Sequence, residues 1–429
     1  MPARCALASP LPSTEGVAAR RAALAMLDAV LRRGRTLDSA AQGSRGLAPA
    51  DQGLAIAIAG EVLRRLPDLD AMIDSATRQR LPDDSKARMV LRLALAQKIG
   101  LGTPEHALVA TALPLVDGGP RRLVHGVLGT LLRRGIDSSA PPRLPEDVEH
   151  RWEAAWGADV VAAARRQIAS RPALDLSFAS AEAATAYAAD HGGVSLATRH
   201  VRLDNAQAIP SLAGFGGGGW WVQDLAASLP ARLIPADAAD VLDLCSAPGG
   251  KAMQLAAAGH RVTAVDLAES RLKRLSENLD RTGLSANLVA ADALSWKPGR
   301  QFDAVLLDAP CSATGTFRRH SEVLYRARPR VIADSAALQS RLLARAAEWV
   351  RPGGTLVYSV CSLEPQEGEQ VVADFLARHD RFQVGGAGPQ MPAFVAATDR
   401  GFLRILPGLL ESEGGLDGFF AARLVRAAD

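Results

Sequence analysis

The hydrophobic pattern changes near residue 140, from helical spacing to short apolar strands. Apolar positions in Val17–Leu27 fall on one face at helical spacing, and few runs of β-branched residues occur before residue 135. Five further helical runs, separated by turns with Pro or Gly, cover residues 51–65, 67–80, 85–99, 104–116 and 121–134. The pattern predicts an all-α domain over residues 16–137, preceded by a disordered lead at residues 1–15.

A polar, Pro-rich segment at residues 138–146 is the expected linker to the rest of the chain. Beyond it the pattern is mixed, with helices predicted at 147–171 and 181–191, strands at 173–178 and 201–203, and a short helix beginning at 220–224. This order predicts a helical and small α+β subdomain over residues 147–235, followed by a third domain over residues 236–429.

The third domain begins with a strand, a glycine turn and a helix. Val241–Leu244 is apolar around a single acid, Ala247–Gly250 forms a Pro-Gly-Gly turn, and Ala252–Ala257 continues as a helical run. This is the first unit of a doubly wound sheet, in which ligands lie at the carboxyl ends of the strands. Because Gly249 and Gly250 have no Cβ, a ligand can approach backbone N–H groups near the helix N-terminus. The sequence therefore predicts a Rossmann-like α/β domain.

Three later strands each lead to an acid, at Asp266, Asp292 and Asp308. An acid at the end of the second strand, about 20 residues after the glycine turn, is placed to accept hydrogen bonds from ribose hydroxyls. Any one of these acids alone would be an ordinary solvated strand end. Three of them in order behind one glycine turn favour a site for a nucleotide-like cofactor.

Composition narrows the class of protein. The chain has 429 residues, of which 22% are charged and 48% apolar, as in soluble proteins with several domains. Residues 1–140 hold 19 basic and 13 acidic residues, and such a basic region suits a polyanionic partner. Four cysteines without a C-x-x-C pair predict reduced thiols and no metal site. No signal peptide or membrane span is visible, so we expect a cytoplasmic protein that binds no membrane.

Two of the four cysteines follow predicted strands of the same sheet, where the ligand crevice is expected. Cys311 is flanked by Pro310 and Ser312, and Cys361 stands between Val360 and Ser362 ahead of a polar loop. Buried cysteines are usually small hydrophobic residues, but these flanks are not typical of a core. The two thiols are therefore candidates for chemistry.

The sequence DAPC at residues 308–311, followed by YSVCS at 358–362, resembles the signature of the NOL/NOP/Sun family of RNA cytosine-C5 methyltransferases. The glycine turn, the acids and both cysteines recur in order from about residue 224 to 420. The helical region ahead resembles NusB through PEHALV at 104–109 and the helix at 124–134. The resemblance implies a methyltransferase domain that uses S-adenosylmethionine, preceded by two RNA-binding regions. It further implies a monomer whose target is RNA, with 16S ribosomal RNA as the expected substrate.

Cytosine C5 is a poor carbon nucleophile, and adding a thiolate at C6 makes C5 able to attack the methyl group of a sulfonium. By resemblance, Cys361 is the nucleophile, Cys311 serves proton removal or product release, and Asp308 hydrogen-bonds a protonated N3. Asp266 would hold the ribose hydroxyls and Asp292 the adenine amino group. The residues expected to bind the cofactor are Cys245, Ser246, Ala247, Pro248, Gly249, Gly250, Lys251, Asp266, Asp292 and Asp308.

Three alternatives remain open from the sequence. The same chemistry could act on another RNA, such as tRNA. A methyltransferase for amines or other bases would commonly carry an aromatic residue where Cys311 stands. A non-catalytic RNA-binding or antitermination factor would not need two cysteines and a complete cofactor loop. Arg318 and Arg319 also have two interpretations, as a clamp on a phosphate near the target base or as a solvated loop.

Overall fold

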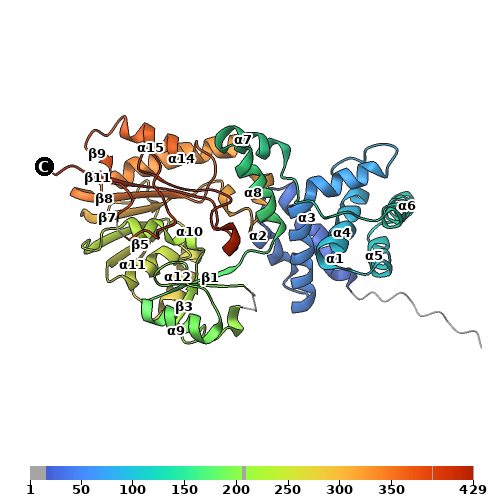
Figure 1. The fold of residues 1–429 in the computed structure, drawn as a ribbon, viewed down its shortest axis with the longest axis horizontal. Coiled ribbons are helices and arrows are strands. Elements are labelled where there is room, and N and C mark those ends of the chain that lie inside the picture. The colour runs from blue at the N-terminus through green and yellow to red at the C-terminus, as the bar shows by residue number, and fades with distance from the viewer. Residues whose placement is uncertain (1–15, 205–208, 389, 429) are drawn as a thin grey trace, which may run out of the picture. The chain divides into compact units, whose positions relative to one another are not determined.

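The computed structural model describes residues 16–204, 209–388 and 390–428, so the lead predicted at 1–15 lies outside the described residues. The chain forms two compact units (Figure 1). The first contains the residues up to Glu146 together with His320–Arg326, and the second contains Asp147–Arg319 and the chain from Ala327 onward. A short piece of the C-terminal half therefore belongs to the N-terminal unit.

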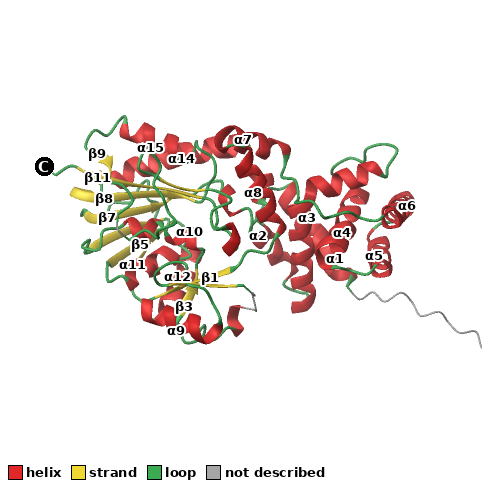
Figure 2. Cartoon of the chain, viewed as in Figure 1, coloured by secondary structure: helices red, strands yellow, loops and turns green. Residues whose placement is uncertain are grey.

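The first unit is helical throughout its described residues (Figure 2). Its helices are α1 (Val17–Leu31), α2 (Leu37–Ala41), α3 (Pro49–Ser75), α4 (Lys86–Leu101), α5 (Glu105–Ala112), α6 (Gly118–Arg134) and α13 (Val323–Arg326). Helix α4 is central, because it packs on α1, α3, α5 and α6 and buries residues on all sides. The all-α prediction for this region is confirmed.

Helix α3 replaces the two helices that the sequence pattern predicted at residues 51–65 and 67–80. Pro67 lies inside the helix and has no N–H to donate to the carbonyl oxygen of Leu63. The hydroxyl of Tyr325, from α13, donates a hydrogen bond to that oxygen at 2.8 Å. A partner from a distant segment thus satisfies the carbonyl that proline leaves free, and the helix continues.

The second unit begins with two helices and a small antiparallel sheet. The helices are α7 (Glu146–Trp156) and α8 (Ala158–Ala169), and the sheet has the order β2-β1-β3 with α9 packed on it. These elements are β1 (Leu174–Phe178), α9 (Ala181–His191), β2 (His200–Leu203) and β3 (Trp220–Val222). The helix predicted to begin at 220–224 is wrong at its start, because Trp220 and Trp221 are buried and pair with β1 as a strand. Helix α10 (Leu225–Ser228) follows Asp224, whose side chain caps it.

The large sheet has eight strands among the described residues, in the order β10-β11-β8-β7-β4-β5-β6, with β9 paired to β11. The strands are β4 (Asp240–Leu244), β5 (Arg261–Asp266), β6 (Asn287–Ala290), β7 (Phe302–Asp308), β8 (Val350–Val360), β9 (Phe382–Val384), β10 (Leu403–Ile405) and β11 (Phe419–Arg426). The five strands from β8 to β6 are parallel, and β11 is antiparallel to β8. This arrangement confirms the predicted Rossmann-like domain.

Helices cover both faces of this sheet. Helices α11 (Gly250–Ala257) and α12 (Glu269–Thr282) share one hydrophobic core with the sheet, and α14 (Pro329–Ala347) and α15 (Glu369–Leu376) share the other. Strand β4 has β5 on one side and β7 on the other, so the strand order reverses between β4 and β7. In open α/β sheets the ligand crevice lies at such a reversal, beyond the carboxyl ends of the strands.

Candidate active site

The glycine turn joins β4 to α11 in a tightly packed conformation. Cys245 has φ of +58° and Gly249 has φ of +108°, and Gly249 directly precedes the helix. A Cβ at Gly249 would lie 2.1 Å from Cδ1 of Leu275, so only glycine fits there. The hydroxyl oxygen of Ser246 is buried and has no hydrogen-bond partner among the described residues. The turn thus offers bare backbone and a polar atom without a partner, which fit a polar ligand.

Asp266 and Asp292 follow neighbouring parallel strands, as the sequence predicted. The Asp266 side chain is buried and accepts hydrogen bonds from Ala247 N at 3.2 Å and Ala268 N at 2.9 Å. Asp292 is exposed, and its Oδ1 accepts from Leu294 N at 2.9 Å. Because a carboxylate has about four acceptor sites, both acids keep capacity for a ligand. Their roles toward a cofactor stay predictions.

Asp308 ends β7 at the reversal of strand order and binds two side chains. Its Oδ2 lies 2.7 Å from Nζ of Lys251, which comes from the first turn of α11. Its Oδ1 accepts from Oγ of Ser359 at 2.8 Å, across the β7–β8 pair in which these two residues face each other. Lys251 is 10% exposed and Asp308 31% exposed. The glycine turn and the DAPC motif therefore meet through an ion pair at the crevice.

The two predicted catalytic cysteines lie next to each other. The sulfur atoms of Cys311 and Cys361 are 3.5 Å apart, and both side chains are partly accessible. The backbone fixes the pair, since Gly315 N donates to Cys361 O at 3.0 Å and Ala309 N donates to Ser359 O at 2.9 Å. The neighbouring Cys361 sulfur and burial raise the pKa of Cys311 well above 9.0. Cys311 is therefore a protonated thiol at neutral pH.

A buried glutamate that sequence reasoning missed holds the two cysteine loops together. Glu367 accepts a hydrogen bond from Ser312 N at 2.8 Å, and its carboxylate also accepts from the hydroxyls of Ser312 and Ser362. Ser312 follows Cys311 and Ser362 follows Cys361. Gln339 of α14 donates to the same carboxylate at 3.2 Å. Nothing in the spacing of the PQEGEQ loop singles Glu367 out from its neighbours.

Asp243 is the second group that the sequence did not mark as special. Its side chain is fully buried in β4, and neither carboxyl oxygen has a hydrogen-bond partner among the described residues. Burial, with a smaller contribution from the charge of Asp308, raises its pKa to about 8. The same causes, burial first and then nearby acids, raise the pKa of Cys245 to about 12. The Cys245 thiol is therefore unsuited to act as a nucleophile.

Both sequence-based interpretations are wrong for Arg318. Arg318 is 2% exposed and forms ion pairs with Asp224 and, at 2.7 Å, with Asp417. Arg319 also pairs with Asp417. Two acids buried nearby draw the Arg318 guanidinium inward, so it neither faces a phosphate nor forms part of a solvated loop, whereas Arg319 stays exposed beside Asp417. The cluster ties the loop after Cys311 to α10 and to the chain before β11.

Two family models match stretches of this chain. Residues 230–425 match the family model described as 16S rRNA methyltransferase RsmB/F, and residues 17–133 match the NusB family. Ribosomal RNA small subunit methyltransferase B from Xanthomonas campestris pv. campestris is 35% identical, covering 96% of this chain and 98% of the relative. The chain belongs to the RsmB/F family of 16S rRNA methyltransferases. The resemblance drawn from the DAPC and YSVCS motifs is thereby confirmed.

A second RsmB/F relative and a solved structure extend the match. The methyltransferase B of Erwinia tasmaniensis is 33% identical, covering 93% of this chain and 96% of the relative. The crystal structure of PH0851 has a TM-score of 0.73, with 22% identity over 97% of this chain and 99% of that one, which shows a shared fold. As a member of the RsmB/F family, the chain is an RNA methyltransferase that uses S-adenosylmethionine, the cofactor expected from the sequence.

The described residues hold neither a candidate metal site nor a candidate membrane span. No group of three or more His, Cys, Asp or Glu side chains in this part of the chain is arranged to hold a metal ion. Within the same residues, no helix combines the length and apolar character needed to cross a bilayer.

Proposed function

We propose that this enzyme methylates C5 of a cytosine in 16S ribosomal RNA through a covalent bond between Cys361 and C6 of the base. The observation that carries the proposal is the pair of sulfur atoms 3.5 Å apart, beside the Lys251–Asp308 ion pair and the glycine turn. A cysteine with only a packing role would not need a second thiol beside it. Addition to C6 and the later release of the product, in contrast, need two groups with different tasks.

Cys361 acts as the nucleophile. Its sulfur, as a thiolate, adds to C6, and the electron pair of the C5–C6 double bond then makes C5 nucleophilic. The Cys311 sulfur lies 3.5 Å from that sulfur, within hydrogen-bonding reach. After C5 has gained the methyl group, loss of the C5 proton restores the double bond and expels the Cys361 sulfur.

Cys311 removes the C5 proton or assists the release of the product. The largest cause of its raised pKa is the Cys361 sulfur beside it. Once Cys361 is bonded to C6, that sulfur no longer competes for a proton, and the pKa of Cys311 falls. A larger fraction of Cys311 has then lost its proton to solvent, and this thiolate can accept the C5 proton.

Asp308 orients the base. Lys251 and Ser359 each occupy one of its carboxylate oxygens, at 2.7 Å and 2.8 Å, and fix the plane of the group at the end of β7. Each oxygen keeps a lone pair that can accept from the protonated N3 of the cytosine. Protonation at N3 withdraws electrons from C6 and makes it a better target for the thiolate.

S-adenosylmethionine supplies, when bound, a methyl carbon on a positively charged sulfur. The residues that would hold it are those of the turn from Cys245 to Lys251, with Asp266 for the ribose and Asp292 for the adenine. The closely packed Gly249, the partnerless hydroxyl of Ser246 and the free acceptor sites on both acids support this assignment.

The regions ahead of the catalytic sheet bind the RNA in this proposal. The NusB-like region at 16–137 and the subdomain at 147–235, joined by the linker at 138–146, grip the backbone, and residues 236–429 form the catalytic domain. A cytosine must leave any base stack to expose C6, so single-stranded or looped RNA is preferred. We infer a monomer that acts in the cytoplasm.

Base-resolution mapping of 5-methylcytosine tests the function. Cells lacking this protein should lose one 5-methylcytosine in 16S ribosomal RNA, and the intact gene should restore it, whereas a Cys361→Ala variant should not. The same mapping of tRNA covers the alternative substrate. Loss of a tRNA mark with an unchanged 16S pattern would contradict the proposed target, and an unchanged pattern in both would contradict the proposed activity.

A further inference from the structure

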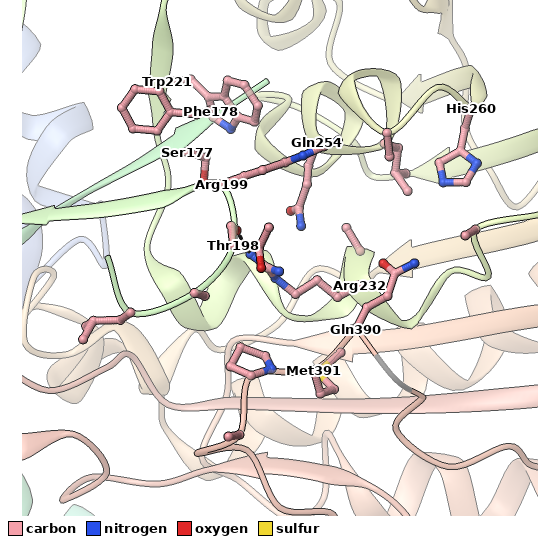
Figure 3. A pocket seen from close by; sticks show the side chains of 18 residues that line it. Ser177, Phe178, Thr198, Arg199, Trp221, Arg232, Gln254, His260, Gln390 and Met391 are labelled. Carbon is pink, nitrogen blue, oxygen red and sulfur yellow. Dashed lines mark hydrogen bonds between the residues drawn. The ribbon is translucent and has the colours of Figure 1, made fainter. Parts of the chain in front are cut away.

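A second hollow in the catalytic unit is lined by two arginines that the methyl-transfer site does not use (Figure 3). Its volume is about 550 Å³, within the ordinary range for small-molecule pockets. Ser177 and Phe178 of β1 line it from the small sheet, and Gln254 lines it from α11. We call it the Arg199–Arg232 pocket, after the two basic side chains that reach it from separate segments.

The pocket lies away from the two cysteines. Ala258 and His260, which line it, are in the turn before β5 and so lie at the amino end of a parallel strand. Cys311 and Cys361 follow the carboxyl ends of β7 and β8 in the same sheet. The pocket is therefore separate from the crevice in which the methyl group is transferred.

The charged side chains that line the pocket are both arginines. None of the 18 described residues that line it is an aspartate or glutamate, whereas Arg199, Arg232 and His260 are basic. Neither arginine has a carboxylate within 4.0 Å among the described residues, and each donates to a backbone carbonyl instead. Burial lowers the pKa of Arg232, and the charge of Arg199 lowers it further, so the two guanidinium groups are close enough to repel.

Both arginines have more N–H donors than their hydrogen bonds to backbone carbonyls use. Arg232 donates from Nη2 to Thr198 O at 2.7 Å, while its Nε is buried and has no partner among the described residues. Arg199 donates from Nη1 to Ala257 O at 3.1 Å. Each guanidinium has five donors, so most remain available for a ligand. Arg199 also has φ of +60°, an uncommon conformation for a residue with a side chain and one that clusters at ligand sites.

We propose that the Arg199–Arg232 pocket binds a phosphate group, carried either by the backbone of the substrate RNA or by a free nucleotide. Two guanidinium groups without a carboxylate repel each other until an anion lies between them, and their planar forks match phosphate oxygens. Gln390 adds a neutral amide to the lining, while the Gln254 amide already donates to Ser228 O at 2.9 Å. Phosphate is the chemistry that both sources share.

The first arm of the test measures RNA binding by fluorescence polarisation over a range of salt concentrations. The double variant Arg199→Gln/Arg232→Gln should bind RNA about tenfold more weakly, from the loss of charge-assisted hydrogen bonds to one phosphate. Its plot of log affinity against log salt should be shallower by about 0.7, the value for one phosphate contact to a single strand. The matched control, Arg274→Gln/Arg400→Gln, removes two exposed arginines that do not line the pocket. An equal change in the control would overturn an RNA phosphate site.

The second arm measures the melting temperature with inorganic phosphate and with cytidine 5′-monophosphate. If either raises the melting temperature of the wild type but not of the double variant, while RNA binding is the same in both, the phosphate comes from a free nucleotide. The variant Arg199→Lys/Arg232→Lys keeps both charges but loses the planar forks, so it should keep the wild-type salt dependence with weaker binding, which separates loss of the site from loss of folding. If the double variant matches the wild type in both arms, the pocket is no phosphate site. Methyl transfer at saturating RNA is measured separately. Failure of the phosphate site would therefore leave the proposed function untouched.

Discussion

Glu367 accepts hydrogen bonds from Ser312 and Ser362, so one buried carboxylate joins the loops that carry Cys311 and Cys361. Replacing it should loosen the distance between the two sulfur atoms. We expect Glu367→Ala to lower kcat about 100-fold, the cost of misplacing reacting groups by roughly 1 Å. The KM for S-adenosylmethionine should stay within about twofold, because the loops and not the glycine turn are disturbed.

The variant Glu367→Gln provides the control for this positioning role. Its amide oxygen can still accept from Ser312 N, and its amide nitrogen can donate to the hydroxyls of Ser312 and Ser362, so it should recover much of the lost kcat. Steady-state kinetics at a temperature where all three proteins are folded decides the matter. A rise in KM with unchanged kcat would show that Glu367 supports binding rather than the cysteine pair.

Variants of the two cysteines should differ in whether they accumulate a covalent protein–RNA complex. With Cys311→Ala, addition of Cys361 to C6 proceeds while release stalls, so a covalent protein–RNA complex should accumulate on denaturing gels. With Cys361→Ala, and with the double variant, no complex should form. A complex formed by Cys361→Ala but not by Cys311→Ala would reverse the roles, and methylation by Cys361→Ala would exclude its role as nucleophile.

Lys251 should matter through its charge on Asp308. We expect Lys251→Met to lower the single-turnover rate of methyl transfer by about tenfold to 100-fold, since an active-site charge contact is typically worth a few kcal/mol. Lys251→Arg keeps the charge and should lose less. Rates measured for all three proteins at saturating cofactor test this, and equal losses for Met and Arg would show that the shape of lysine, not its charge, is required.

Asp243 should make stability fall as pH rises. In the folded protein its pKa is about 8, raised first by burial, whereas the unfolded carboxyl titrates near 3.8. Between these values the folded state keeps a proton that the unfolded state has lost, so unfolding releases a proton. The free energy of unfolding should therefore decline by about 1.4 kcal/mol per pH unit from this group between pH 5 and 7.

The variant Asp243→Asn isolates that contribution, because its amide does not titrate. Denaturant unfolding of both proteins at pH 5, 6 and 7 gives the difference directly. The variant should gain stability relative to the wild type at each step upward. A difference that stays constant with pH would mean that Asp243 is ionised in the folded protein.

Tyr325 and Pro67 should be coupled in stability. Tyr325→Phe removes the donor to Leu63 O and leaves a buried carbonyl without a partner, at a cost of about 1–3 kcal/mol. Adding Pro67→Ala supplies a backbone N–H that can bond to the same oxygen, so the double variant should be more stable than Tyr325→Phe alone. Thermal or denaturant unfolding of the wild type, Tyr325→Phe, Pro67→Ala and the double variant forms a double-mutant cycle, and simple additivity would refute the coupling.

The sequence predicted the architecture because its periodic signals are local. The all-α region, the strand–turn–helix unit and the acids at the strand ends all follow from spacing within a few residues. Cys311 and Cys361 were also found in this way, since both follow parallel strands whose carboxyl ends meet at one edge of a sheet. The elements that a periodic pattern along the chain predicts are kept in the folded protein.

The features that the sequence did not predict depend on contacts between residues that are distant in the chain. Helix α3 continues through Pro67 because of Tyr325, and Arg318 turns inward because of Asp224 and Asp417. Glu367 is special only because two serines from separate loops reach it. No rule based on residue spacing encodes contacts of this kind. Helix propensity and local charge therefore predicted the wrong structure for these residues, or none.

The short segment His320–Arg326 has a consequence for how the protein can be taken apart. The polypeptide leaves the catalytic unit after Arg319, packs within the helical unit and returns at Ala327. Cutting the chain once near residue 146 would not free an independent catalytic half. The seven residues His320–Arg326 would then lack the helical unit against which they pack. The NusB-like region is thus no detachable accessory, and any protein that replaced it would have to offer Tyr325 a new acceptor.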